Sequence, residues 1–444
     1  MASLTLCCSR RALVANTHHT KANGSSTWRL MHTLQRRQQQ LQQSCGRLRA
    51  AAAAATTTTR TAFAIEPKVN ANCSAFQQRC NTTDAKKKPK LVSIKESRRF
   101  MIDCFKAVCV PEDHAVAQAE LLVGADIRGH FSHGMNRLEM YVNDLATNAT
   151  DGKAEPEILS ETKATAWVDG HNGLGAVVGN FCMDLAIDKA FDVGVGWVCA
   201  KGSNHYGMSG WYVLRAMEMG LVGMSMTNTS PLMAPTGAKK AALGTNPLSM
   251  GASADNCDGF LLDMATTAVA VGKIEMQRRK AAPIPAGWAL DPNGKVTTDA
   301  ELAFKTGCLM PLGGAEDTSG YKGFGLGAMV DILSGVMAGA KYSTQVRSWT
   351  HHGADIEADL GHVFIAVDPS CFAPNFGKRL SDFNSRLRGI EKADPCKPVL
   401  IAGDKEKKNL ETIEEAGGIE YLENQLKTCE ALAKKLKIKP LKFL

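Results

Sequence analysis

The spacing of apolar side chains predicts helices at the start of the folded region, which we expect to begin near Leu91. In "SIKESRRFMIDCFKAVCV" (93–110), apolar residues recur every three or four positions, and the run stops at Pro111. "PEDHAVAQAELLVGADI" (111–127) opens with a proline and two acids, as helix N-termini often do. "GMNRLEMYVNDLA" (134–146) returns to helical spacing. The pattern therefore predicts a helical part over about 91–150.

Farther along the chain, strand and helix patterns alternate. Short apolar runs bounded by turn residues predict strands at 163–170, 195–200, 259–265 and 361–369, and longer periodic runs predict helices at 174–194, 266–280, 323–340 and 417–436. We expect a mixed α/β part over about 151–400 and a C-terminal helix over about 417–438. This order predicts a mixed α/β fold with a helical N-terminal part.

The positive charge of the chain is concentrated before the folded region. The formal net charge is +8, but residues 1–65 contain eight Arg, one Lys and no Asp or Glu, so the rest carries about −1. This acid-free, Arg-rich composition predicts a mitochondrial targeting segment, with plastid import as an alternative. The other alternative is a low-complexity tail that leaves the protein in the cytoplasm. Residues 66–90 are interpreted as a linker to the catalytic region at 91–430.

Two classes of partner are not expected. The charge of the folded region gives no reason to predict nucleic-acid binding, and no apolar run is long enough to span a bilayer. The chain has 14 cysteines, and those in the folded region are scattered without a CxxC pair. That usage is typical of small buried hydrophobic residues, not of a disulfide framework or a zinc site.

"KGSNHYGMSGW" (201–211) contains the first candidate for catalysis, between a predicted strand and a helix expected to begin near Met208. At a helix N-terminus the dipole disfavours imidazolium, so the pKa of His205 should fall from its usual value of about 6.5. A neutral imidazole between Gly202 and Gly207 suits proton transfer to or from a substrate oxygen. The alternative is a connection in which His205 only hydrogen-bonds the main chain.

"RGHFSHGMNRLEMY" (128–141) contains candidate substrate-binding residues. His133, Arg137 and Tyr141 follow one another at intervals of four, so on one helix they would share a face. A guanidinium binds a carboxylate through two hydrogen bonds, and a tyrosine hydroxyl adds a donor. Recognition of a carboxylate beside a proton-transfer group is what 2-hydroxy-acid chemistry requires. The alternative is a helix start capped by Ser132, with solvated charges, and His130 suits that alternative best.

A metal site at "HFSH" is the weaker interpretation. Two histidines three apart can share a metal, but no HExxH motif, partnering cysteine or acidic cluster lies nearby in sequence. We assign no metal ligand.

Three further segments carry polar or glycine-rich patterns. The loop at 225–252 follows an apolar strand and is dense in Gly, Thr, Asn and Pro, as ligand-binding loops often are. Asp263 ends a predicted strand and either accepts from a ribose hydroxyl or caps the following helix. Gly323, Gly325 and Gly327 alternate, but without the GxGxxG spacing or a preceding strand they do not support a doubly wound Rossmann domain.

Taken together, these segments resemble the malate/L-lactate dehydrogenase family that includes ureidoglycolate and sulfolactate dehydrogenases and is distinct from the Rossmann-type enzymes. The resemblance covers about 93–430 and rests on motifs in family order. These are "DIRGHFSHGMNRLEMY", "SNHYG", "MTNTSPLMAPTG", "GTNPLSMGA", "DMATTAVAVGKIEMQRRKAAPIPAGWALDPNGKVTTD" and "YKGFGLGAMVDILSGVMAGA". The segments 311–325 and 348–364 match less well, and no cofactor contact is assigned in the latter.

The resemblance implies an NAD(P)-dependent oxidoreductase, usually a homodimer, with a non-Rossmann NAD(P)-binding α/β domain. It implies that His205 is the proton acceptor and that His133 and Arg137 line the substrate pocket. The cofactor contacts that it implies are Thr229, Asp263, Met264, Ala265, Lys322 and Gly323. In this interpretation Gly323 lets the main chain lie against the cofactor.

The resulting hypothesis is hydride transfer between a small 2-hydroxy or 2-oxo acid and NAD or NADP. Arg137 would hold the carboxylate, His205 would take the hydroxyl proton, and His133 would orient the substrate oxygen. The rival hypothesis is a metal-dependent hydrolase or lyase that uses His130, His133 and His205. A third is a catalytically silent protein that binds NADH.

Overall fold

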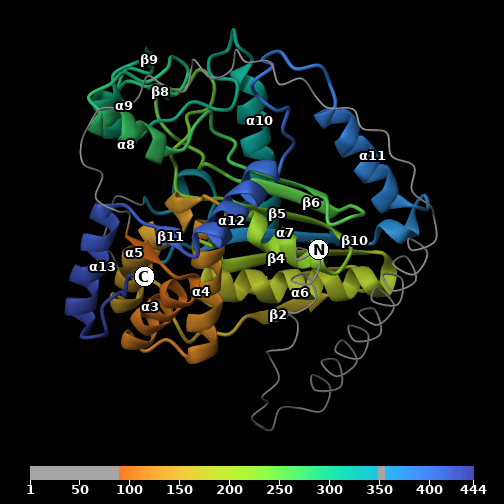
Figure 1. Ribbon diagram of the computed structural model, residues 1–444, viewed down its shortest axis with the longest axis horizontal. Helices are drawn as coiled ribbons and strands as arrows, with labels where there is room; N and C mark the ends of the chain where they lie inside the picture. Colours follow the sequence, from red (N-terminus) through yellow and green to blue (C-terminus); the bar gives the residue numbers. More distant parts are fainter. Residues whose placement is uncertain (1–89, 349–355) are drawn as a thin grey trace, which may run out of the picture. The chain divides into compact units, whose positions relative to one another are not determined.

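The N-terminal helices pack together with the C-terminal end of the chain. The computed structural model describes residues 90–348 and 356–444, so the predicted targeting segment at 1–65 and nearly all of the linker lie outside the described residues. This part consists of β1 (Leu91–Val92), α3 (Ile94–Ala107), α4 (Glu112–Ile127), α5 (Leu138–Ala146), β11 (Ile419–Glu420) and α13 (Glu423–Leu436). The helices share one buried apolar cluster, and Figure 1 shows α3, α4, α5 and α13 gathered around it. The predicted start of the folded region near Leu91 agrees with β1.

The C-terminal helix begins later than the sequence pattern predicts. Residues 417–422 are not helical, because Ile419 and Glu420 pair in antiparallel fashion with Val92 and Leu91. The helix α13 therefore starts at Glu423. A two-residue strand that depends on a partner more than 300 positions away leaves no local pattern.

The predicted mixed α/β fold is confirmed by a seven-stranded mixed sheet in the order β2-β3-β4-β10-β5-β6-β7. Its strands are β2 (Glu157–Glu161), β3 (Thr165–Asp169), β4 (Val195–Ser203), β5 (Val222–Thr227), β6 (Leu248–Ser253), β7 (Gly259–Met264) and β10 (Leu360–Val367). Only β3 and β4 are parallel. All the other pairs are antiparallel, which excludes a doubly wound parallel sheet.

Helices cover both faces of the sheet at its centre. On β10, Phe364 and Ala366 pack toward α6 (Gly175–Val193) and α7 (Gly210–Glu218), while Val363 and Ile365 pack against Val330 and Ala338 on the other face. Successive side chains of a strand point to opposite faces, so a strand covered on both sides is apolar throughout. This accounts for the unbroken apolar run that predicted β10.

Helix α10 (Gly320–Asp331) continues into a π-helical turn (Ile332–Val336), so the predicted helix at 323–340 forms in two pieces. Between β7 and α10, residues of α8 (Val271–Arg279), β8 (Ala289–Leu290) and α9 (Ala300–Thr306) contribute to a smaller cluster, and β9 (Val296–Thr297) pairs with β8. After β10 come α11 (Phe376–Arg388) and α12 (Asp404–Ala416). Within the described residues, no helix is both long and apolar enough to cross a bilayer.

The sheet register brings several loops to one end of the sheet. Ser203, the last residue of β4, pairs with Leu360, the first residue of β10, and Thr227 at the end of β5 pairs with His362. Leu248, the first residue of β6, pairs with both Met226 and Met264. The loops that follow β4, β5 and β7 therefore leave the sheet at the same end.

Candidate active site

His205 lies in the loop after β4, at the end of the sheet where β5 and β7 also finish. The loop is held in place by its neighbour Tyr206, which is buried, stacks on His362 at 4.6 Å and hydrogen-bonds the hydroxyls of Ser209 and Ser225. Helix α7 begins at Gly210, slightly later than predicted, so His205 lies before the helix and not in its first turn. The half-buried imidazole is held instead by a side chain from another part of the chain.

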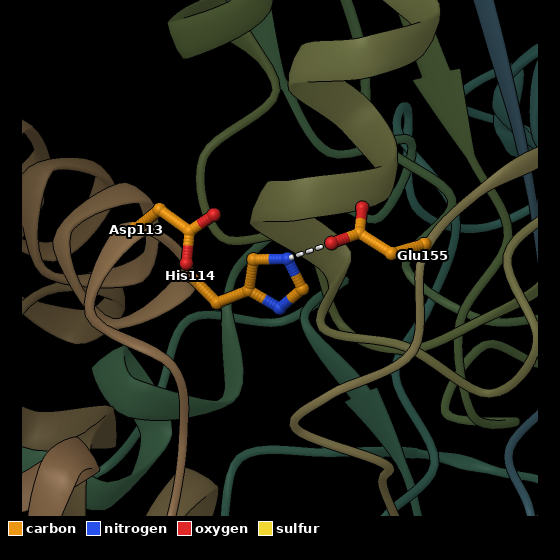
Figure 2. A group of neighbouring side chains, drawn as sticks. All are labelled: Asp113, His114 and Glu155. Carbon is orange, nitrogen blue, oxygen red and sulfur yellow. Dashed lines mark hydrogen bonds and ion pairs between the residues drawn. The ribbon is translucent and has the colours of Figure 1, made fainter. Parts of the chain in front are cut away.

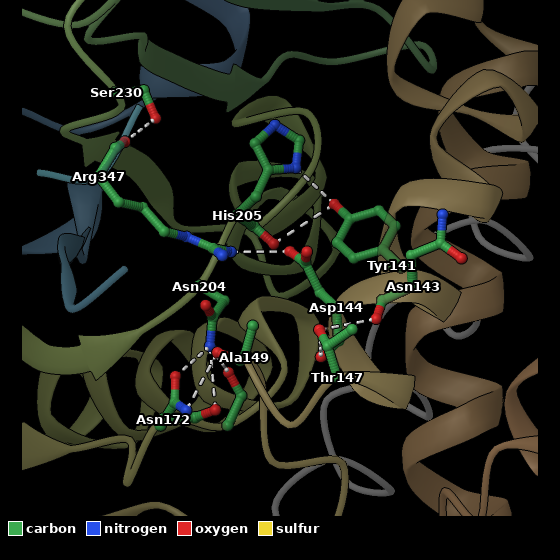
Figure 3. Close-up of polar contacts among 11 residues, drawn as sticks. Tyr141, Asn143, Asp144, Thr147, Ala149, Asn172, Asn204, His205, Ser230 and Arg347 are labelled. Atoms are coloured by element: carbon green, nitrogen blue, oxygen red, sulfur yellow. Dashed lines mark hydrogen bonds and ion pairs between the residues drawn. The ribbon is translucent and has the colours of Figure 1, made fainter. Parts of the chain in front are cut away.

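That side chain is Tyr141 of α5, which is only 3% exposed. Its hydroxyl oxygen lies 2.5 Å from Nδ1 of His205 and 3.3 Å from the carbonyl oxygen of the same residue (Figure 3). The N–H of Gly207 also lies 3.4 Å from Nδ1, and that long contact needs the lone pair on this nitrogen. The tautomer with Nδ1–H forgoes it and forms both contacts of the hydroxyl, because Nδ1–H donates to Tyr141 and Tyr141 donates to the carbonyl. In that tautomer the lone pair of the neutral imidazole is on Nε2. The predicted substrate-binding hydroxyl of Tyr141 is thus engaged by His205.

The prediction that His133, Arg137 and Tyr141 share one continuous helix is wrong. His133 ends one 3-10 turn (Phe131–His133) and Arg137 ends another (Met135–Arg137), whereas Tyr141 belongs to α5. The break comes at Gly134, whose φ and ψ of −99° and −131° are not helical. A spacing of four residues does not define a face once the helix is interrupted.

The three side chains nevertheless converge near His205. The ring of His133 stacks on that of His205, with centroids 5.9 Å apart and planes inclined by 22°. Ser132 contacts both His133 and Arg137, because its hydroxyl lies 2.9 Å from Nδ1 of His133 and its carbonyl accepts from Nε of Arg137 at 2.8 Å. The structure therefore brings two histidines, an arginine and a tyrosine from two distant segments to one place.

Burial favours the neutral form of both imidazoles. Burial is the main cause that lowers the pKa of His205 well below its usual value, and electrostatic interactions with His133, Arg137 and His362 lower it further. Burial also lowers the pKa of His133 to about 3. The expected neutral histidine is present, but the cause differs from the helix dipole that the sequence suggested.

Several predicted cofactor residues lie at the same end of the sheet. The N–H of Thr229 donates to Oδ1 of Asn246 at 3.2 Å, and its hydroxyl accepts from the N–H of Thr245 at 2.9 Å. Thr245 in turn accepts from the N–H of Thr266, just past Met264 and Ala265. The loops after β5 and β7 are thereby joined beside the loop of His205.

Asp263 does not cap the helix that follows it, which was one of the two roles considered from the sequence. Its Oδ2 accepts from the N–H of Gly210 at 2.7 Å, so it caps α7 and not the helix that follows it. Burial raises the pKa of this carboxyl group. A carboxylate has a second oxygen, so the predicted contact with a ribose hydroxyl stays a prediction.

The structure shows a packing reason for Gly323, because a Cβ at this position would lie 2.1 Å from the carbonyl oxygen of Leu312. The glycine therefore permits close packing of α10 on the chain at Leu312. Lys322 is exposed on the same helix, with Nζ 5.9 Å from the ring of Tyr321. Their cofactor contacts stay predictions.

A small pocket opens beside His205 and Tyr141. Asn204 lines it, and although Nδ2 of this residue donates to Asn172 and Gly173, its Oδ1 is buried with no hydrogen-bond partner among the described residues. Arg347 lines it as well and pairs with Asp144 at 2.8 Å (Figure 3). A residue that lines the pocket thus carries a buried acceptor without a hydrogen-bond partner among the described residues.

Among the described residues, the one group with a geometry that can hold a metal consists of Asp113, His114 and Glu155 (Figure 2). His114 is 5% exposed, with Nδ1 3.0 Å from the carbonyl of Gly152 and Nε2 3.1 Å from Glu155. None of the histidines of the rival hypothesis belongs to it. Asp113 and His114 lie in the first turn of α4, where the helix dipole disfavours a cation.

Sequence reasoning missed three residues of this region. Asn204 lies inside the "SNHYG" motif, in which only His205 was predicted to have a role. Asp126 is the first residue of "DIRGHFSHG", and its side chain accepts a hydrogen bond from the N–H of Met135 in the loop that carries His133. Arg347 lies outside every motif and had no local signal.

Comparison with known proteins decides the family. The sequence model described as Malate/L-lactate dehydrogenase matches residues 92–429, which is most of the chain. This chain belongs to the malate/L-lactate dehydrogenase family. The resemblance inferred from the six motifs is thereby confirmed. Its named relatives are hydroxy-acid dehydrogenases, which favours this class of enzyme over the metal-dependent hydrolase or lyase.

Its relatives in the family include a malate dehydrogenase of Pyrococcus horikoshii, 40% identical over 316 residues that cover 70% of this chain and 86% of the relative. An L-sulfolactate dehydrogenase of Methanocaldococcus jannaschii is 38% identical over 70% of this chain and 88% of the relative. The solved structure of malate dehydrogenase from Entamoeba histolytica superposes with a TM-score of 0.75 and 29% identity, covering 79% of this chain and 99% of that one.

The names of two relatives specify nicotinamide cofactors, the pair expected from the sequence. One is a ureidoglycolate dehydrogenase (NAD(+)) of Escherichia coli O157:H7, 33% identical over 66% of this chain and 81% of the relative. The other is a (2R)-3-sulfolactate dehydrogenase (NADP(+)) of Chromohalobacter salexigens, 30% identical over 65% of this chain and 84% of the relative. The family thus uses both cofactors.

Proposed function

We propose that this protein is an NAD(P)-dependent dehydrogenase that interconverts a small 2-hydroxy acid and its 2-oxo acid. Malate and 3-sulfolactate are the first substrates to test, since relatives in the family are named for them. The observation that carries the proposal is the convergence of His205, His133, Arg137 and Tyr141 from two distant segments. A base, its orienting partner and a guanidinium for a carboxylate are the protein groups that the reaction requires.

In the oxidation, His205 accepts the hydroxyl proton of the substrate on Nε2. Tyr141 keeps the imidazole in the tautomer that has its lone pair there, by accepting from Nδ1–H. The neutral state favoured by burial is the state that a general base needs. In the reduction, the same nitrogen returns the proton to the oxygen of the 2-oxo acid.

Arg137 binds the carboxylate of the substrate in this proposal. Its Nε is already used by the carbonyl of Ser132, which fixes the direction of the guanidinium. A two-bond contact with a carboxylate would therefore use the two terminal nitrogens. His133 stacks beside His205 and would orient the substrate oxygen.

Thr229, Asp263, Met264, Ala265, Lys322 and Gly323 are proposed to hold the cofactor. When bound, a nicotinamide ring supplies the acceptor or donor of the hydride. The polar loops after β5 and β7 lie beside the His205 loop, and the unsatisfied Oδ1 of Asn204 suits a donor such as a carboxamide N–H. These groups fit a nicotinamide dinucleotide.

The proposal is tested by a screen of 2-hydroxy and 2-oxo acids with NAD and with NADP, followed at the absorbance of the reduced nicotinamide. His205→Gln should lower kcat by about 10²–10⁴-fold with NADH binding retained, since general acid–base catalysis is worth that much. Tyr141→Phe should lower kcat and leave NADH affinity unchanged. Turnover by His205→Gln at the wild-type rate would remove this residue from the base role, and loss of activity on chelation would favour the metal-dependent rival.

We further propose that the protein is a homodimer. An apolar row follows α10 and the π-helical turn, and its side chains are 42–54% exposed: Tyr321, Met329, Ile332, Val336 and Met337. Exposed apolar patches of this kind mark association surfaces. Ile332→Glu should give a monomer in light scattering, and an unchanged mass for that variant would place the contact elsewhere.

Mitochondrial import is proposed for residues 1–65. The support is their composition, with eight Arg, one Lys and no acid. Fusion of residues 1–90 to a fluorescent protein tests this, with the eight arginines of residues 1–65 changed to Gln as the control. Plastid or cytoplasmic fluorescence would correct the assignment.

A further inference from the structure

Asp126 is a buried carboxyl group beneath the substrate loop, which we define as residues 130–137. It lies in the last turn of α4 and is 0% exposed. Its Oδ2 accepts from the N–H of Met135, inside the substrate loop, at 3.0 Å. A carboxyl group is seldom fully buried without a role that offsets the cost of removing it from water.

The same oxygen also binds the C-terminal part of the chain. The phenol of Tyr421, which follows β11, donates to Oδ2 of Asp126 at 2.8 Å, and the hydroxyl of Ser97 on α3 lies 3.2 Å from the phenol oxygen. Tyr421 is 295 positions away from Asp126 in sequence. One acceptor atom therefore connects the substrate loop with the strand and helix that end the chain.

The other oxygen of Asp126 determines how closely the loop can approach. Oδ1 has no hydrogen-bond partner among the described residues, and a Cβ added at Gly134 would lie 1.9 Å from it. The hydrogen bond from Met135 thus holds the loop at the carboxyl group, and Gly134 packs closely against the same group. These two contacts lie between His133 and Arg137 in the sequence, so they determine where both side chains go.

The charge of Asp126 is not needed for these contacts. Burial raises the pKa of this carboxyl group to about 7, with the hydrogen bonds from Met135 and Tyr421 opposing the rise. The other ionisable groups that interact with it are Tyr421 and Cys429. A proton on Oδ1 leaves Oδ2 able to accept both donors, so neutral and charged forms hold the loop alike.

We propose that Asp126 is a positioning residue: through Oδ2 it fixes the substrate loop and makes substrate binding depend on the docking of Tyr421. The inference rests on the proposed function, since the loop carries His133 and Arg137. It assigns to the C-terminal segment a part in substrate binding, although no residue of that segment lines the pocket beside His205.

The experiment compares Asp126→Asn, which keeps an acceptor oxygen, with Asp126→Leu, which has the same shape and no acceptor. We expect Asp126→Asn to stay within about threefold of the wild-type KM for the acid. For Asp126→Leu we expect KM to rise by about tenfold or more, with a smaller effect on kcat and an unchanged Kd for NADH. Tyr421→Phe should give an intermediate KM. Because this variant removes only one hydroxyl, it still tests the proposal if Asp126→Leu does not fold.

The matched control is Asp331→Leu. Asp331 is a buried aspartate on α10 that accepts from the N–H of Ser343 at 3.0 Å, away from the substrate loop. It should lower stability and leave KM for the acid unchanged. An unchanged KM in both Asp126→Leu and Tyr421→Phe, or equal damage from Asn and Leu at position 126, overturns the proposal.

Hydrogen exchange separates this inference from the proposed function. Peptides covering 128–138 should exchange faster in Asp126→Leu and Tyr421→Phe than in the wild type, but not in Asp331→Leu. This readout needs no substrate. If the wild type turns over no hydroxy acid yet shows this pattern, the proposed function fails and the positioning role survives; wild-type exchange in both variants refutes the positioning role.

Discussion

Gly134→Ala is the substitution for which the structure allows the most direct estimate. An alanine Cβ here would lie 1.9 Å from Oδ1 and 2.2 Å from Cγ of Asp126, whereas ordinary contact begins at 3.4 Å. Asp126 is fixed by Met135 and Tyr421, so the loop itself has to move by about 1.5 Å. The strain should cost about 1–3 kcal/mol of stability, as overpacking does elsewhere.

The same displacement of the loop should also lower activity. A misplacement of about 1 Å costs on the order of 10²-fold in rate when it changes the approach of reacting groups. We therefore expect kcat/KM for the hydroxy acid to fall by about 100-fold, or about 2.7 kcal/mol of transition-state stabilisation. Most of the loss should appear in KM, because Arg137 moves with the loop.

Steady-state kinetics and NADH fluorescence titration measure the two effects separately. Gly272→Ala in α8 is the control, since a Cβ there meets nothing within 4 Å. It should leave both constants unchanged and stabilise the helix by about 0.5–1 kcal/mol. The reasoning is refuted if folded Gly134→Ala retains kcat/KM within threefold of the wild type.

Three further results are expected. Arg137→Lys should raise KM for the acid by about tenfold or more with little change in kcat, because lysine lacks the planar fork, and an unchanged KM would argue against carboxylate binding. The pKa of His205 is lowered, so kcat/KM for the oxidation should fall by less than twofold between pH 7.5 and pH 6; a base with a pKa of 6.5 would lose about fourfold. The pKa of Asp126 is raised from 3.8 to about 7, so its contribution to stability is fully present below pH 4 and lost as the pH rises through 7. Urea unfolding at pH 5 and pH 8 should therefore show a smaller pH dependence in Asp126→Asn than in the wild type, by a few kcal/mol, and equal dependence would contradict this assignment.

The elements with strong periodicity were predicted correctly from the sequence. Helices α3, α4 and α6 and strands β4, β7 and β10 follow the expected ranges closely, because each has a complete apolar face or is apolar throughout. The helix through 134–146 was predicted one turn too early. Its first turn is broken by contacts of Gly134 with Asp126, which belongs to a different element.

The residue types of the site were also accessible from the sequence, since histidines, arginine and tyrosine cluster in "RGHFSHGMNRLEMY" and "SNHYG". What each side chain does was not. The hydroxyl of Tyr141 contacts His205 across 64 positions, and Asp263 caps a helix that begins 53 positions before it. Hydrogen-bond partners at such separations depend on the packing of α5, α7 and β7 and leave no periodic signal.

By itself, the sequence determined the helical beginning, the mixed α/β order, the family motifs and the chemistry that those residue types can perform. Only the tertiary structure decided that burial lowers the pKa of His205, that the hydroxyl of Tyr141 contacts its imidazole, and that Asp126 binds the N–H of Met135 between His133 and Arg137. The physical reason is that apolar periodicity depends on residues close together in the sequence. Desolvation and single hydrogen bonds depend on segments that meet only when the chain is folded.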